Sequence, residues 1–398
     1  MTGAPLRESG QRTRQAPPQS QASRPAYLDC AASTPMRPGA VEAMVPFLET
    51  QFANPSGAHR MARRAREAID DAREIVADAL GFDPHGVVFT SGGTEADNLA
   101  VRGVAAATGT TALCPATEHH AVLHPVEAVG GRVVRVEADG TVDLDHLAAQ
   151  LEPEAGPPAG LVSAMLVNNE SGLIADLDAV AEVVRRHAPG ALMHTDAVQA
   201  VNWVDLAESA RAADLLSLSA HKFGGPKGVG VLALRPGVAL SAQQLGGGQE
   251  ADRRSGTHNT AGIVALGAAL AELAKTRDAD IERLGSMADR LADGLAAAID
   301  GCRATVARSQ RAAGICQLLI EGIETEALLV LLDRCDVMAS AAASCASGAM
   351  EPSHVLAAMG IDRRVAAGSL RLSLGWCTEP WEVEHALEFI PPCVEQLR

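Results

Sequence analysis

Short apolar runs that alternate with amphipathic helical stretches are the feature that most constrains how this chain can fold. Residues 87–90 have the pattern of a buried strand, and residues 94–103 have that of the helix after it. The other apolar runs cover residues 161–167, 191–194 and 215–219, and helical patterns at 63–80 and 177–187 separate such runs. This alternation predicts an α/β fold with a mostly parallel, doubly wound sheet. Ligands of such folds bind at the carboxyl ends of the strands.

Composition narrows the classes of function. The chain has 398 residues and a formal net charge of −16, so we do not expect nucleic acid as its main ligand. No apolar run approaches the ~18 residues of a membrane helix, and the sequence therefore predicts no membrane span. Eight scattered cysteines without a C-x-x-C pair indicate a reducing, cytoplasmic location rather than a disulfide framework or a zinc site.

The first 25 residues differ from the rest of the chain. Residues 1–25 are rich in Gln, Ser, Pro and Arg and show no apolar periodicity, which predicts a disordered leader. Their composition also fits an organelle transit peptide, but they lack an amphipathic helical pattern.

A glycine-containing turn follows the predicted strand at 87–90. Ser91, Gly92, Gly93 and Thr94 open the next helix, where free N–H groups can bind an anion such as phosphate. Thr94 and Asp97 also fit a capping box, which would make the motif purely structural. The turn alone leaves both interpretations open.

Two further polar residues follow later predicted strands. Asp196 has the position of a helix cap, a metal ligand or a partner for a ring nitrogen. Lys222 stands before a glycine-rich turn, which is the setting of a Schiff-base lysine and also of an ordinary loop lysine. Chemistry that needs a primary amine has few candidates, because the only other lysines are Lys227 and Lys275.

Together these motifs match the needs of pyridoxal phosphate, which are a lysine amine, an acid for the ring nitrogen, an anion cradle and a stacking group. Lys222, Asp196 and the turn at 91–94 supply the first three. His119 follows another short apolar stretch and supplies the fourth in a chain with few aromatic residues. His119, with the nearby His120 and His124, also permits a metal cluster or exposed loop histidines. No matching carboxylate spacing accompanies them, so we expect no metal.

Segments that follow one another along nearly the whole chain carry a resemblance to a known family. These segments are residues 27–29, 54–57, 90–98, 117–119, 167–172, 194–199, 219–222, 254–257, 344–348, 351–354 and 370–375. In them the chain resembles the cysteine desulfurases of the NifS/IscS type, within the class V aminotransferases.

The resemblance implies pyridoxal 5'-phosphate as cofactor and L-cysteine as substrate. Lys222 would hold the cofactor covalently, His119 would stack on its ring and act as an acid or base, and Asp196 would pair with its ring nitrogen. Further cofactor contacts would come from Gly93, Thr94, Asn169, Gln199, Ser219 and His221, and from Thr257 of a second copy across a dimer interface. Asn54 and Arg371 would hold the substrate carboxylate.

The resemblance makes Cys345 the nucleophile that accepts the sulfur as a persulfide. Cys345 lies among small residues at 339–349, a composition that predicts a mobile loop. A small buried core residue is the alternative, since free cysteines usually are buried. Ala343 and Ser344 precede the cysteine where many members of the family have Gly-Ser-Ala, which affects the expected rate and partner more than the reaction.

The implied fold is the type I aminotransferase-like fold, with a large cofactor domain at residues 39–275. A smaller α/β domain would consist of residues 26–38 and 276–398. A homodimer would convert L-cysteine to L-alanine and pass the sulfur to an acceptor protein, such as an iron–sulfur scaffold or a thiolation pathway. A selenocysteine lyase or class V aminotransferase on the same fold, and a non-catalytic sulfur carrier, are the alternatives.

Overall fold

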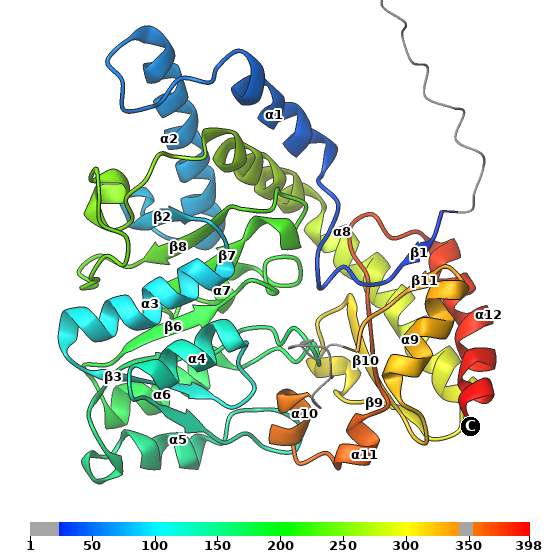
Figure 1. Ribbon diagram of the computed structural model, residues 1–398. Helices are drawn as coiled ribbons and strands as arrows, with labels where there is room; N and C mark the ends of the chain where they lie inside the picture. The colour runs from blue at the N-terminus through cyan, green and yellow to red at the C-terminus, as the bar shows by residue number, and fades with distance from the viewer. Residues whose placement is uncertain (1–23, 342–352) are drawn as a thin grey trace, which may run out of the picture.

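The computed structural model describes residues 24–341 and 353–398 (Figure 1). Most of the predicted leader and the stretch around Cys345 lie outside the described residues. A large sheet and a small sheet lie toward opposite ends of α8 (Thr260–Ala298), a 39-residue helix that packs against elements of both.

The large sheet has seven strands in the order β2-β8-β7-β6-β5-β3-β4. Its strands are β2 (Val87–Thr90), β3 (Thr111–Pro115), β4 (Arg132–Val134), β5 (Ala159–Ser163), β6 (Leu192–Asp196), β7 (Leu215–Ser219) and β8 (Gly230–Leu234). Strands β3 to β7 pair in parallel, and only β8 runs antiparallel to its neighbours β2 and β7. The predicted α/β fold with a mostly parallel sheet is therefore confirmed. The predicted strand at 161–167 ends earlier, at Ser163.

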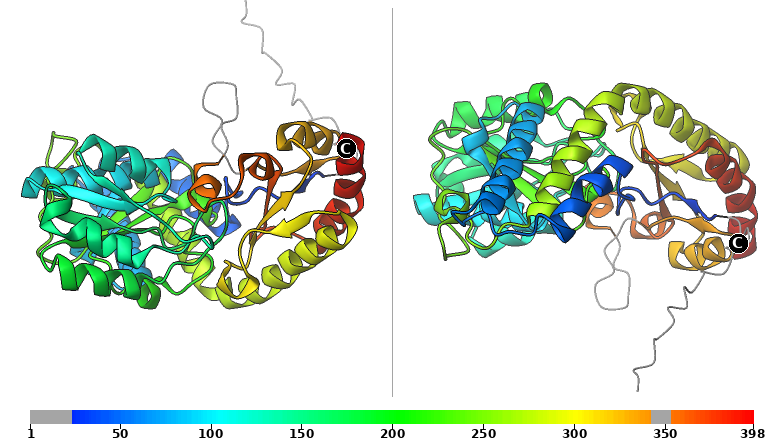
Figure 2. Two further views of the ribbon diagram at one scale, coloured as in Figure 1. Left: turned by 90° about the horizontal axis from the view of Figure 1, so that it is seen from below. Right: turned by 90° about the horizontal axis from the view of Figure 1, so that it is seen from above.

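Helices cover both faces of the large sheet (Figure 2), as a doubly wound fold requires. One face packs against α3 (Gly93–Thr108) and α4 (His120–Ala128), and the other carries α2 (Arg60–Leu80), α6 (Leu177–His187) and the first half of α8. Because both faces are covered, a central strand such as β7 is buried along its whole length. The amphipathic spacing of α6 explains how its sequence buries one face only.

The small sheet is antiparallel, with the order β12-β10-β9. Its strands are β9 (Cys302–Ala304), β10 (Ile315–Ile320) and β12 (Ser369–Ser373). Beside it, β1 (Ala26–Tyr27) pairs in parallel with β11 (Val337–Met338), so the first described residues lie with the C-terminal part of the chain. The predicted domain boundary at 275/276 falls inside α8. The domain limits given above stay predictions.

The remaining helices connect these layers. They are α1 (Pro38–Glu49), α5 (Leu144–Leu151), α7 (Leu206–Ser209), α9 (Thr325–Arg334), α10 (His354–Ala358), α11 (Arg363–Ala366) and α12 (Pro380–Leu397). Short 3-10 helices are η1 (Pro84–Gly86), η2 (Pro153–Ala155), η3 (Ala220–Lys222), η4 (Gln249–Asp252) and η5 (Arg308–Gln310). None of the helices in the described part of the chain has the length and apolar character needed to cross a membrane.

Candidate active site

A cavity of about 290 Å³ opens at the carboxyl ends of the parallel strands. It brings together most of the site residues predicted from the sequence. These are Gly93, Thr94, His119, Asn169, Asp196, Gln199, Ser219, His221, Lys222 and Arg371. They come from separate segments that meet because parallel strands end on the same edge of the sheet.

Lys222 stands directly after β7, in the short 3-10 helix η3. Its Nζ donates hydrogen bonds to the carbonyl oxygens of Ala31 (2.6 Å) and Ala32 (3.0 Å). Burial of the amine, together with the positive charge of Arg371, lowers the pKa of Lys222 to about 8. The amine is therefore within reach of its neutral, nucleophilic form near neutral pH.

Asp196 ends β6 and is buried, with Oδ1 accepting a 2.9 Å hydrogen bond from the N–H of Val198. Burial raises the pKa of Asp196 to about 6, and the charge of Lys222 opposes that rise. A cationic ring nitrogen beside Asp196 would favour the ionised form of this carboxyl group in the same way.

His119 is the N-cap residue of α4, where its Nδ1 accepts a 3.1 Å hydrogen bond from the N–H of Ala121. The surrounding protein and the charge of Lys222 lower the pKa of His119 to about 4, although the ring is still exposed on its open side. The imidazole is consequently neutral at pH 7, and its Nδ1 is occupied. Its Nε2 is the nitrogen left for chemistry in the cavity.

The start of α3 lies at the cavity and has no side-chain cap. Gly92 is the N-cap and offers no side chain to the free N–H groups. A Cβ at Gly93 would lie 2.7 Å from Cγ2 of Val198, so glycine keeps this part of the cavity open. The alternative of a capping box between Thr94 and Asp97 is wrong, because the N-cap is Gly92, two residues before Thr94, and the Asp97 side chain is buried.

Asp97 is one of two further buried acids near Asp196. Its Oδ1 has no hydrogen-bond partner among the described residues and lies 3.7 Å from Nε2 of the buried His194. Glu118 is the other, with one carboxylate oxygen on the N–H of Met165 (2.5 Å). Burial and the charge of Asp196 raise the pKa of both Asp97 and Glu118. Both shifts favour the protonated forms of these two carboxyl groups.

Arg371, in β12, brings a guanidinium to the wall of the cavity. It donates to the carbonyl oxygen of Asn169 (2.7 Å) and to Oδ1 of Asp29 (2.8 Å). Its Nε–H is buried and has no partner within the described residues. A cation held in place at the cavity wall is suited to a substrate carboxylate.

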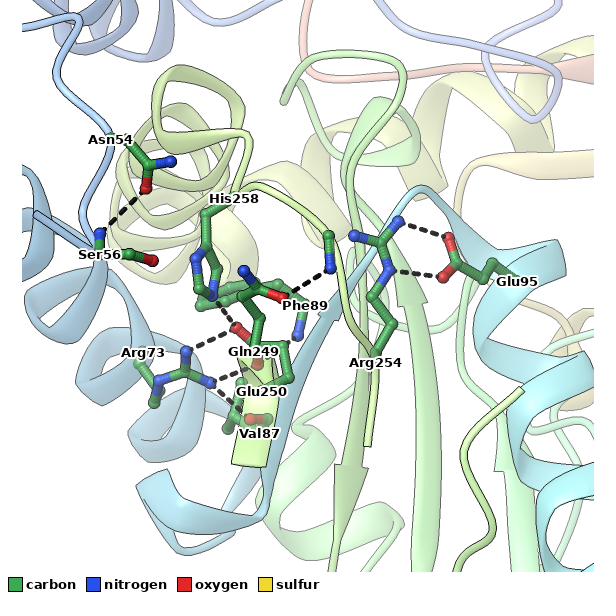
Figure 3. A network of polar contacts seen from close by, with 11 residues as sticks. Asn54, Ser56, Arg73, Val87, Phe89, Glu95, Gln249, Glu250, Arg254 and His258 are labelled. Atoms are coloured by element: carbon green, nitrogen blue, oxygen red, sulfur yellow. Dashed lines mark hydrogen bonds and ion pairs between the residues drawn. The ribbon is translucent and has the colours of Figure 1, made fainter. Parts of the chain in front are cut away.

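Three predicted site residues do not line this cavity. Asn54 is exposed and accepts a 3.0 Å hydrogen bond from the N–H of Ser56 (Figure 3). Thr257 is also exposed, between η4 and α8. Cys345 lies outside the described residues.

Sequence reasoning missed several residues that shape the cavity. Asp29 falls within a segment that carried the family resemblance, but nothing in the sequence indicates that it pairs with Arg371. The carbonyls of Ala31 and Ala32 have no sequence signal at all, since any residue has a carbonyl. Asp97 belonged to a motif that was singled out, and its helical spacing behind Gly93 could have indicated an inward side chain.

The residues present fit pyridoxal phosphate. Lys222 supplies the amine, Asp196 a carboxylate for a ring nitrogen, and His119 a neutral ring beside them. The open N–H groups of α3, with Ser219 and His221 nearby, form a cradle for the phosphate. A Cβ at Gly93 would crowd Val198 beside that cradle.

Comparison with known proteins gives this site its context. The profile of the family described as Aminotransferase class-V matches residues 26–385. The chain therefore belongs to the class V aminotransferases. A cysteine desulfurase of Cereibacter sphaeroides is 41% identical over 381 residues, covering 94% of this chain and 96% of that protein. At this identity and coverage the chain is a member of the cysteine desulfurases within that family.

Solved structures agree with this assignment. A NifS-like protein superposes with a TM-score of 0.86 at 31% identity, covering 94% of this chain and 100% of that one. A structure described as SspA in complex with cysteine gives a TM-score of 0.73 at 32% identity, covering 87% of this chain and 98% of that one.

Proposed function

We propose that this protein is a pyridoxal-phosphate-dependent cysteine desulfurase that converts L-cysteine to L-alanine and transfers the sulfur to Cys345. One observation carries the proposal. Lys222, Asp196, His119 and Arg371 face a single cavity in a chain that belongs to the cysteine desulfurases.

When bound, pyridoxal phosphate supplies an electron sink for the negative charge that develops at the α-carbon of an amino acid. Asp196 keeps the ring nitrogen protonated, because an ionised buried carboxylate favours a proton on its partner. Lys222 would hold the cofactor, and its neutral amine would take the α-proton of the substrate. The lowered pKa of Lys222, about 8, supports this role as a base.

Arg371 binds the substrate carboxylate and thereby fixes the orientation of the α-carbon. Its contacts with Asp29 and the Asn169 carbonyl hold the guanidinium in place, which limits the entropy lost when substrate binds. His119 stays neutral near pH 7 and exchanges a proton through Nε2 near the substrate sulfur.

The sulfur leaves the substrate by attack of the Cys345 thiolate. A bond forms between the Cys345 sulfur and the substrate sulfur while the bond between the substrate sulfur and the β-carbon breaks. The β-carbon keeps the electron pair and takes a proton, and the α-carbon regains a proton from Lys222, which gives alanine. The products are L-alanine and a Cys345 persulfide, which passes its outer sulfur to an acceptor protein. The acceptor is an iron–sulfur scaffold or a component of a thiolation pathway.

We further propose a homodimer in a reducing, cytoplasmic compartment. Asn54 and Thr257 are exposed and do not line the cavity of their own chain, which supports the dimer. The seven cysteines of the described residues are all free thiols, which supports a reducing environment.

Alanine release from L-cysteine, with a thiol reductant present, tests the function. We expect activity in the wild type, none in Lys222→Ala, and none in Cys345→Ala despite a wild-type cofactor spectrum. Full alanine release by Cys345→Ala would indicate another class V enzyme. A strong preference for selenocysteine in the same assay would indicate a selenocysteine lyase, and a purified protein that never takes up the cofactor would indicate a non-catalytic carrier.

A further inference from the structure

An ion pair lies beside the first turn of α3 (Figure 3). Glu95 belongs to that turn, and Arg254 lies in the segment between η4 and α8, 159 residues later in the sequence. Nε of Arg254 donates a 2.7 Å hydrogen bond to Oε1 of Glu95, and Nη2 donates a 3.2 Å bond to Oε2. The guanidinium and the carboxylate therefore meet in bidentate geometry, which is a strong arrangement for such a pair.

The two side chains of this pair are mostly covered by the protein, with Arg254 21% and Glu95 19% exposed. Burial alone would raise the pKa of Glu95, but hydrogen bonds from Arg254 and Ser91 lower it below its usual value. Glu95 is therefore ionised at neutral pH, and Arg254 supplies the opposite charge. Loss of one partner from such a pair leaves the other charge without compensation.

Glu95 also contacts the turn that leads into the cavity wall. Its Oε2 accepts a 2.7 Å hydrogen bond from the N–H of Ser91, two residues before the cavity residue Gly93. The first hydrogen bond within α3 runs from the N–H of Ala96 to the carbonyl oxygen of Gly92 (3.1 Å), so the earlier N–H groups of the helix have no partner inside it. The Glu95 carboxylate thus lies at the same helix end as the N–H groups that form the phosphate cradle.

A carboxylate in this place opposes the binding of a phosphate dianion. The positive end of a helix attracts both groups, and two anions at one helix end repel each other. Of the described residues that line the cavity, the basic groups charged at neutral pH are Lys222 and Arg371, since burial lowers the pKa of each of its two histidines to about 4. In the proposed function Lys222 serves the cofactor aldehyde and Arg371 the substrate carboxylate. Arg254 is the cation that contacts Glu95 itself.

We propose that Arg254 is a positioning residue for the cofactor phosphate, which acts by pairing with Glu95 and so neutralising a carboxylate that would otherwise repel the phosphate at the start of α3. This role rests on the proposed function, because that function supplies pyridoxal phosphate as the ligand. Without the Arg254 charge, the carboxylate of Glu95 weakens the binding of a phosphorylated ligand. A ligand without a phosphate group meets no such repulsion.

Binding of pyridoxal phosphate and of pyridoxal to the apoenzyme tests this role. The two ligands share the ring and the aldehyde and differ only in the phosphate group, and fluorescence titration gives the Kd of each. In Arg254→Gln we expect the Kd for pyridoxal phosphate to rise about tenfold and the Kd for pyridoxal to stay within about twofold of the wild type. Normal binding of pyridoxal also shows that the variant folds. An equal rise of both Kd values would show a general structural defect and overturn the proposal.

Removal of the repelling charge should rescue the variant. When Glu95→Gln is added to Arg254→Gln, no carboxylate remains beside the cradle, and the Kd for pyridoxal phosphate should return to within about threefold of the wild type. Arg254→Lys keeps the positive charge and should also bind within about threefold of the wild type. A double variant that binds pyridoxal phosphate as weakly as Arg254→Gln alone would overturn the proposal, because the Glu95 charge would then not be the cause of the loss.

Arg290 in α8 offers a matched control. Its guanidinium also forms a bidentate pair, with Glu384 of α12 (2.5 and 2.6 Å), but both side chains are more than half exposed and neither residue lines the cavity. Arg290→Gln changes the net charge by the same amount and should leave both Kd values within about twofold of the wild type. A loss of pyridoxal phosphate affinity equal to that of Arg254→Gln would show an effect of net charge alone, against the proposal.

The same titrations distinguish failure of this role from failure of the proposed function. A wild type that binds pyridoxal phosphate far more tightly than pyridoxal, together with an Arg254→Gln variant that binds both ligands like the wild type, would overturn the role of Arg254 and leave the proposed function intact. A wild-type apoenzyme that does not bind pyridoxal phosphate would overturn the proposed function, and the role of Arg254 with it.

Discussion

Lys222 supplies the only primary amine among the described residues that line the cavity, and its surroundings favour the neutral form of that amine. Burial and the positive charge of Arg371 both lower the pKa of this amine, while the carboxylates of Asp196 and Asp29 raise it. The net result is a pKa of about 8, below the usual 10.5 of a lysine. An amine with such a pKa reacts with a carbonyl group at neutral pH far better than a surface lysine does.

The rate at which the apoenzyme attaches pyridoxal phosphate should therefore follow the titration of Lys222. With a pKa of about 8, the neutral fraction is about one tenth at pH 7, about half at pH 8 and about nine tenths at pH 9. The attachment rate, measured by absorbance, should rise about fivefold from pH 7 to pH 8 and level off above pH 9. A tenfold rise with each pH unit up to pH 10 would show an ordinary lysine pKa and contradict the structure.

At the scale of single elements, the start of α3 depends on the absence of a side chain at Gly93. In Gly93→Ala the new Cβ would lie 2.7 Å from Cγ2 of Val198, so Val198 or the helix must move into the space for the phosphate. We expect the Kd for pyridoxal phosphate, measured by fluorescence titration of the apoenzyme, to rise about tenfold. Gly285→Ala is the control, because a Cβ there meets its nearest neighbour at 3.5 Å. The control should bind normally and gain about 0.5 to 1 kcal/mol of stability.

The turn η4 is an element held by a single buried carboxylate (Figure 3). Glu250, Ala251 and Asp252 all have positive φ angles, of 51°, 55° and 61°, which are uncommon for residues with a Cβ. Glu250 accepts hydrogen bonds from Arg73 (two at 2.9 Å) and from the N–H of Phe89 (3.0 Å), and contacts His258 at 2.7 Å. These bonds offset the strain of the turn and join it to β2 and α2.

Glu250 should make the stability of this turn dependent on pH. Burial alone would raise the pKa of Glu250, but hydrogen bonds from His258 and Arg73 lower it from 4.5 to about 2. A lowered folded-state pKa contributes stability that is complete above pH 4.5 and is lost as the pH falls toward 2, up to about 3 kcal/mol. In urea titrations, Glu250→Gln should therefore be less stable than the wild type at pH 7, by a margin that shrinks at pH 3. Equal margins at both pH values would show that the charge has no part in the effect.

The sequence predicted elements well where one local pattern decides them. The predicted strands at 87–90 and 215–219 have the bounds of β2 and β7, because a short apolar run that is buried along its length leaves little choice of secondary structure. The prediction for 161–167 extended too far, since the N–H of Met165 bonds to the Glu118 side chain instead of to a strand. Glu118 lies 47 residues away in the sequence, and no local pattern carries such a contact.

The residues of the candidate site could also be predicted where a local pattern decides them, but not where contacts between distant segments do. Lys222 and Asp196 could be predicted because each follows a recognisable strand and parallel strands end together. The partners of Lys222 could not be predicted. The carbonyls of Ala31 and Ala32 reach it only because the turn after β1 packs against η3, some 190 residues away in the sequence. The pairing of Asp29 with Arg371 likewise depends on how β12 lies beside the first described residues.

At the scale of the whole molecule, two segments form a surface that suits a second copy of the chain. Large apolar side chains of α1 and the loop after it are exposed, with Leu48 at 60% and Phe52 at 72%. Residues 55–56 of that loop and residues 247–251 of the η4 region line one shallow pocket. Asn54 and Thr257 flank the same region, outside the cavity of their own chain. Phe52→Asp should therefore shift the protein toward monomer in sedimentation experiments.

Hybrid dimers test whether Thr257 acts across such an interface. Lys222→Ala and Thr257→Ala chains, carrying different tags, are co-expressed and the mixed dimer is purified. One cavity of the mixed dimer then has an intact Lys222 together with the intact Thr257 of the other chain, while the second cavity has both defects. We expect half of the sites to bind pyridoxal phosphate with wild-type affinity, and the Thr257→Ala homodimer to bind about tenfold more weakly at every site. A mixed dimer in which no site binds better than those of the Thr257→Ala homodimer would show that Thr257 does not serve a partner's cavity. Adding Phe52→Asp to both chains should abolish the rescue, because the rescue requires the two chains to associate.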